Sequence, residues 1–156
     1  MKNYREMFTN IQKANSLLLQ KVIELKEYFN SSKTSFNMGE KEINKYYNLN
    51  DNEKAQGFKN EFEKKSEALN KKLIFTCENL KEDEIQKFLK DLVNYYAKVE
   101  DGYFDILNTS KSNEMNASTL FKCEVMLDYY ASNLRNIILL DVKFNNKIDS
   151  FQPQEF

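Results

Sequence analysis

The sequence predicts an all-α fold, an elongated antiparallel coiled-coil bundle of three helices, with residues 1–156 forming a single helical domain. Turn-forming residues are scarce, because the 156 residues include three Gly and one Pro. Apolar residues recur at steps of three and four, which is the spacing of one helix face. Twelve Phe and nine Tyr add more apolar surface than a disordered segment carries. Sheet-based folds need frequent turns, so these observations favour long helices.

The first predicted helix covers residues 3–48. Asn3 and Glu6 have the spacing of a capping box, which marks a helix start. The apolar stripe then follows one face through Leu18, Val22, Leu25 and Phe29. It weakens further on, and two alternatives remain open: one continuous helix, or two helices divided near 31–38.

The second predicted helix is the longest and covers residues 52–109. Its apolar stripe runs from Phe58 to Leu80 and resumes at Ile85, five residues later. Such a slip in an uninterrupted helix rotates the buried face or bends the axis. We therefore predict one helix bent near 81–85, about 87 Å long at a rise of 1.5 Å per residue.

The third predicted helix covers residues 116–151. Its seam comprises Leu120, Cys123, Leu127, Tyr130, Leu134, Ile137, Asp141, Phe144, Ile148 and Phe151. Five further apolar residues lie off this seam: Val125, Met126, Leu139, Leu140 and Val142. They either face two neighbouring helices of the same chain or form the interface of a homodimer. We expect a homodimer, because exposed apolar patches are uncommon on soluble monomers.

The composition argues against catalysis. The chain has no histidine, which removes the commonest general base and metal ligand. Cys77 and Cys123 occupy apolar stripes and are expected to fill the core. The glycines stand alone, so no phosphate-binding loop is present. We expect no enzymatic activity, and we assign no catalytic residue, cofactor or metal ligand.

Charge and hydropathy limit the partners. The net charge is −1, which lacks the basic character of a nucleic-acid-binding domain, so no nucleic acid is expected. No apolar run approaches the roughly 18 residues of a membrane span. Two cysteines are too few for a disulfide framework, and we expect a cytoplasmic protein whose membrane contact, if any, is peripheral.

Lysines of the second predicted helix are the candidates for such a contact. These are Lys54, Lys64, Lys65, Lys71 and Lys72. They would attract an anionic phospholipid membrane. Glutamates are interleaved with them, so the alternative is a salt-bridged face in contact with solvent.

The order of a long helix, a longer bent helix, a polar loop and a returning third helix resembles the BAR (arfaptin-homology) domain. Residues 84–104 are similar to the middle of that family's second helix, with an apolar pair, a Phe and lysine-bearing turns. Residues 119–138 are similar to the start of its third helix. The resemblance implies a crescent-shaped dimer that senses or imposes membrane curvature.

Two functions follow from these observations. The first is a BAR-like dimeric module that binds membranes through the five lysines and senses or scaffolds their curvature. The second is a spectrin-like or tethering rod that holds other helical proteins and does not bind lipid.

Overall fold

The computed structural model describes residues 3–31, 53–112 and 115–151. These ranges form helices and short connections and contain no strand, which confirms an all-α bundle. In chain order the elements are α1 (Tyr4–Ser31), α3 (Glu53–Glu78), the 3₁₀ helix η3 (Glu82–Glu84), α4 (Ile85–Ser110), α5 (Ala117–Ile138) and α6 (Asp141–Phe151).

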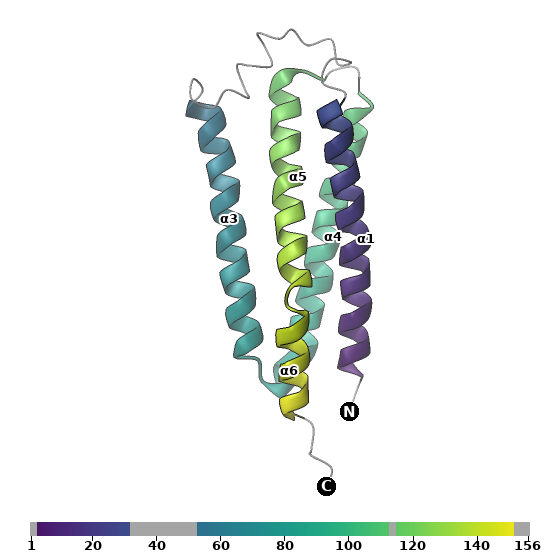
Figure 1. Ribbon diagram of the computed structural model, residues 1–156, viewed down its shortest axis with the longest axis vertical. Coiled ribbons are helices and arrows are strands. Elements are labelled where there is room, and N and C mark those ends of the chain that lie inside the picture. Colours follow the sequence, from purple (N-terminus) through teal and green to yellow (C-terminus); the bar gives the residue numbers. More distant parts are fainter. Residues whose placement is uncertain (1–2, 32–52, 113–114, 152–156) are drawn as a thin grey trace.

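The helices of the described residues form four legs, α1, α3, α4 and α5 with α6. Successive legs alternate in direction (Figure 1). α1 and α4 run one way, whereas α3 and α5 run the other way, and α6 continues the line of α5. The prediction of a three-helix bundle is wrong, because the predicted second helix is divided into two legs, α3 and α4.

The chain reverses direction between α3 and α4. The Asn79 side chain donates to the Phe75 carbonyl at 2.8 Å and so caps the last turn of α3. Lys81 is extended, with φ −97° and ψ 156°, and its N–H donates to the Glu84 carboxylate at 3.2 Å. Leu80 is buried beside the turn. A continuous helix over 52–109 with a bend near 81–85 is therefore wrong, and the phase slip marks a full reversal.

The predicted third helix, residues 116–151, is also divided. α5 ends at Ile138, and Leu139 and Leu140 separate it from α6. Asp141, the one polar residue of the predicted seam, lies in the first turn of α6. A carboxylate there interacts favourably with the positive end of the helix dipole. The polar interruption of the seam thus coincides with a new helix start.

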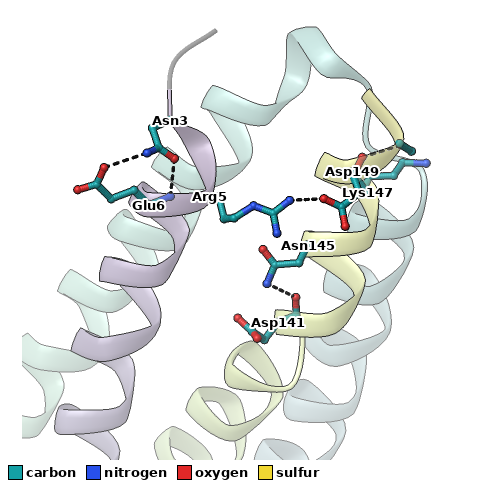
Figure 2. A network of polar contacts seen from close by, with 8 residues as sticks. Asn3, Arg5, Glu6, Asp141, Asn145, Lys147 and Asp149 are labelled. Atoms are coloured by element: carbon teal, nitrogen blue, oxygen red, sulfur yellow. Dashed lines mark hydrogen bonds and ion pairs between the residues drawn. The ribbon is translucent and has the colours of Figure 1, made fainter. Parts of the chain in front are cut away.

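The start of the predicted first helix is confirmed. The Glu6 N–H donates to the Asn3 side-chain oxygen, and the Asn3 amide donates to the Glu6 carboxylate, both at 3.0 Å (Figure 2). The first bond satisfies the Glu6 N–H, a backbone donor that the first turn leaves free, and the second joins the two side chains. The remainder of that prediction, with its division near 31–38, lies outside the described residues.

Two large apolar clusters hold the bundle together. The upper core comes from α1, α4, α5 and the residue Met115, with no contribution from α3: Leu18, Val22, Leu25, Phe29, Val99, Tyr103, Ile106, Met115, Leu120, Cys123, Leu127, Ala131 and Leu134. The lower core adds the end of α3: Phe8, Cys77, Leu80, Ile85, Phe88, Leu89, Leu92, Ile137, Leu140, Phe144 and Ile148. In the lower core the ring of Phe144 stacks on Phe8, with centroids 4.0 Å apart.

Candidate functional site

α3 is the least buried of the long helices, and the candidate site follows from this. Of its 26 residues only Ala55, Ser66 and Cys77 are buried, whereas α5 buries ten of 22. α3 packs against α5 and α6 and has little contact with α4. Two grooves flank it, one beside α4 and one beside α5.

The groove between α3 and α4 has a volume of about 400 Å3. Its floor is apolar and mostly buried, formed by Leu69, Leu73, Phe88, Leu92 and Ile137. Its rim is polar, formed by Lys72, Thr76, Asp91, Asn94 and Lys98. Lys72 of α3 and Lys98 of α4 place a positive charge on each side of the rim, and Asp91 is its one carboxylate. This α3–α4 groove is the more apolar of the two.

The groove between α3 and α5 has a volume of about 610 Å3 and is mainly polar. Ser66 and Ser132 contribute hydroxyl groups to it, and Arg135 contributes a guanidinium group. Its apolar part is the contact between the rings of Phe62 and Tyr129, whose centroids are 5.1 Å apart. The charges around it are of both signs, so this α3–α5 groove has no clear preference for an anion or a cation.

A chain of hydrogen bonds crosses the bundle between the two grooves. The Ser66 hydroxyl donates to the Asn133 side-chain oxygen at 2.7 Å and lies 2.9 Å from the Ser132 hydroxyl. The Asn133 amide donates to the Tyr95 hydroxyl. Ser66 and Ser132 line the α3–α5 groove, and Tyr95 lines the α3–α4 groove. Together with the contact between the Phe62 and Tyr129 rings, this polar chain joins the middle of α3 to α5, and it extends to Tyr95 of α4.

Burial governs the ionisation of groups near the site. It raises the pKa of Tyr95, the nearby Tyr129 raises it further, and the hydrogen bond from Asn133 opposes both. Burial also raises the pKa of the Cys77 and Cys123 thiols. A phenol and thiols of raised pKa stay protonated at neutral pH, so these groups are not activated as nucleophiles. Among the described residues no three His, Cys, Asp or Glu side chains gather as a metal site.

The five predicted membrane-contact lysines all lie exposed on α3. Lys65 pairs with Glu61 at 3.2 Å and stands 4.8 Å from the centre of the Phe62 ring. Lys72 lies on the rim of the α3–α4 groove. Eighteen residues of helix separate Lys54 from Lys72, about 27 Å at 1.5 Å per residue. The lysines therefore extend along α3, with Lys54 apart from the other four.

The five predicted dimer-interface residues divide into two groups. Val125 and Leu140 are buried, with exposed fractions of 6% and 1%, and Met126 packs partly buried against the upper core. Leu139 and Val142 are exposed, with fractions of 74% and 67%. The expectation of an exposed surface is wrong for these two residues, because Val125 packs with Ala55 of α3 and Leu140 lies in the lower core. Leu139 and Val142 stay candidates for a surface contact.

Polar residues of the core were not predicted from the sequence. Gln12, Asn15 and Asn133 are all buried. Gln12 donates to the Ile137 carbonyl at 2.8 Å, beside the break between α5 and α6, and accepts from Asn15 at 3.3 Å. A signal was present, since Gln12 is four residues from Phe8 and Asn15 three from Leu18. Both polar side chains thus share the buried face of α1.

No helix within the described ranges is both long and apolar enough to cross a membrane. Searches against protein-family models, curated proteins and solved structures found no match to this chain.

Proposed function

We propose that the protein is a non-enzymatic helical interaction module that receives an amphipathic helix of a partner protein in the α3–α4 groove. The observation that carries the proposal is the separation of α3 from α4. It leaves an open groove of about 400 Å3 between two helices that are neighbours in the chain. Two helices that flank an apolar groove provide a surface for a third helix.

The chemistry of the groove supports this kind of partner. Leu69 and Leu73 from α3 and Leu92 from α4 offer apolar contacts to one face of a docked helix. Lys72 and Lys98 stand on opposite rims and can pair with acidic residues at the two edges of that face. Interfaces of this kind combine an apolar centre with a polar rim.

Site-specific photo-crosslinking in cells tests the proposal. A photoreactive amino acid is placed at Asn94 on the rim, and in a matched control at the exposed Lys21 on α1. We expect a defined crosslinked partner from position 94 and none from position 21. Leu69→Glu should abolish the crosslink while the helical circular dichroism spectrum is kept. Equal crosslinking from both positions, or none from position 94, contradicts the proposal.

A second candidate function is peripheral attachment to an anionic membrane, with the BAR-like homodimer as its extended form. The observation that favours it is the exposure of all five α3 lysines. Each lysine near an anionic bilayer contributes on the order of 1 kcal/mol. The long second helix does not support it, because that segment is divided into α3 and α4.

Co-sedimentation with phosphatidylserine vesicles at low salt tests this candidate. The test variant reverses four α3 lysines to Glu: Lys64, Lys65, Lys71 and Lys72. The matched control reverses four exposed lysines on α1 and α4: Lys13, Lys21, Lys87 and Lys90. The net charge changes equally in both. Loss of binding in the test variant alone supports the candidate, whereas equal loss in both variants, or no binding by the wild type, removes it.

A further inference from the structure

We propose that two copies of this chain exchange halves about the turn at residues 79–84. The first half is α1 with α3, and the second half is α4 with α5 and α6. In the exchanged dimer, the first half of each copy packs on the second half of the other. The inference does not depend on what the two grooves bind.

The packing of the helices carries the inference. α1 packs mainly against α5 and α4 and also contacts α6, and α3 packs against α5 and α6. Each of these pairings joins the first half to the second half. α1 and α3 are not a packing pair, and α4 with α5 is a minor one. Each half therefore completes its core with the other half, whichever chain supplies it.

The ion pairs between helices follow the same division. Ion pairs between different helices of the described ranges join Arg5 to Asp149, Lys26 to Asp128 and Glu78 to Lys143. Figure 2 shows the Arg5 guanidinium group of α1 pointing at Asp149 of α6. In every pair, one residue belongs to the first half and one to the second.

The covalent link between the halves can adopt a second conformation. Residues 78–85 read Glu-Asn-Leu-Lys-Glu-Asp-Glu-Ile and contain neither Gly nor Pro. All eight residue types tolerate a helix interior, so the segment that forms the turn could also be helical. With this segment helical, α3 and α4 merge into one helix over 53–110 of about 87 Å at 1.5 Å per residue. The two halves of one chain are then held apart, and a second copy supplies the missing contacts.

The turn is stabilised by local contacts, and these set the conditions for exchange. Asn79 caps α3, Leu80 is buried, and Glu82 to Glu84 are acidic residues at the start of α4, where the helix dipole favours them. The exchanged dimer loses these turn contacts. It keeps the contacts between the first and second halves, which now form between two chains. It should therefore form when unfolded chains meet at high concentration, and it should separate slowly, because separation breaks the whole core.

One substitution distinguishes the two conformations. Lys81 is extended, which suits the residue before a proline, and position 82 is the first residue of η3, where proline is tolerated. In a continuous helix, proline at 82 would be interior and would remove a hydrogen bond to Glu78. Glu82→Pro should therefore fold as a monomer and give at least about a hundredfold less dimer than wild type. Glu82→Ala is the matched control and should still form the dimer.

The experiment uses the full chain. Unlabelled and 15N-labelled chains are mixed while unfolded and refolded at a few micromolar and at several hundred micromolar. Light scattering then identifies species of 18.6 kDa and twice that mass. A carbodiimide joins the Glu78 carboxylate to the Lys143 amine, which lie 2.8 Å apart, and mass spectrometry reads the isotopes of the two linked peptides. The pair of Lys26 and Asp128 serves as a second link between the halves.

We expect a dimer at the higher concentration whose linked peptides combine both isotopes, and monomer whose linked peptides carry one. A dimer with only single-isotope links is an ordinary surface dimer and overturns the inference. So does a wild type that stays monomeric at several hundred micromolar, or a Glu82→Pro variant that dimerises as readily as Glu82→Ala.

Discussion

The phenol of Tyr130 occupies the space that a side chain on Gly102 would need. A Cβ atom placed on Gly102 would fall on the Tyr130 hydroxyl and ring. Gly102 therefore allows α4 to approach α5 at this level, where Tyr130 packs against the upper core. The absence of a side chain is a packing requirement here, since the backbone of Gly102 is helical.

Gly102→Ala and Gly57→Ala form a matched pair of substitutions. Alanine in a helix interior normally stabilises by about 1 kcal/mol relative to glycine. Nothing lies within 4 Å of a Cβ atom at Gly57, so Gly57→Ala should raise the free energy of unfolding by that amount. Gly102→Ala must displace Tyr130, and overpacking costs about 1–3 kcal/mol. Urea denaturation should show a gain for the first variant and a net loss for the second.

Leu140→Glu and Leu139→Glu should differ sharply despite their adjacency. Leu140 lies in the lower core, and a carboxylate there would be buried without a partner. We expect a loss of at least about 4 kcal/mol, close to unfolding. Leu139 is exposed, so its substitution should change stability by less than about 0.5 kcal/mol. Thermal denaturation followed by circular dichroism measures both, and a similar loss in both variants would contradict the placement of the α5–α6 break.

Asn133→Ala should destabilise the protein through the hydrogen bonds that it removes. Asn133 accepts from Ser66 and donates to Tyr95, so its removal takes this donor from the Tyr95 hydroxyl, while Ser66 keeps the Ser132 hydroxyl at 2.9 Å. Each unsatisfied buried group costs about 1–3 kcal/mol. Asn94→Ala is a control on the exposed rim and should be nearly neutral. A double-mutant cycle with Ser66→Ala should show a coupling energy between positions 66 and 133, and additive losses would refute the polar chain.

Stability should fall at alkaline pH, and Tyr95 should account for part of the fall. Burial raises the pKa of Tyr95 above the ordinary value of 10.0. Above that value the unfolded state loses this proton before the folded state does, so the unfolded state becomes favoured. The stabilisation is complete below about pH 10 and is lost as the pH rises from there toward the folded pKa. Urea midpoints measured at pH 8 and pH 11 test this. From pH 8 to pH 11, Tyr95→Phe should lose less stability than the wild type does.

The buried faces of the helices could be predicted from the sequence, whereas the direction of the chain could not. Leu120, Leu127, Leu134 and Ile137 of the predicted seam are all buried in the structure. The periodicity of apolar residues indicates which side chains face a core. It is the same whether the helix continues or ends and is followed by an antiparallel helix. The reversal after Glu78 contains neither Gly nor Pro, so no composition signal separated a bend from a turn.

The candidate site could not be predicted from the sequence either, because the direction of the chain was unknown. Its α3–α4 groove exists because α3 and α4 are separate helices, and a single long helix has no groove between its own two parts. Ser66 stood on the predicted seam, but its partner Asn133 is brought to it by tertiary packing alone. The exposure of the α3 lysines, by contrast, followed directly from their distance to the apolar stripe.

The pairing of every leg in the first half with legs in the second half also determines how the molecule comes apart. Both large clusters draw residues from both halves, so opening one half removes part of the support of the other. We therefore expect no partly folded species in which one half persists. Protected amides of α1 and α4 should exchange with deuterium through the same global event, with one free energy of opening for both. We therefore expect the two halves to fold only together, as a single cooperative unit.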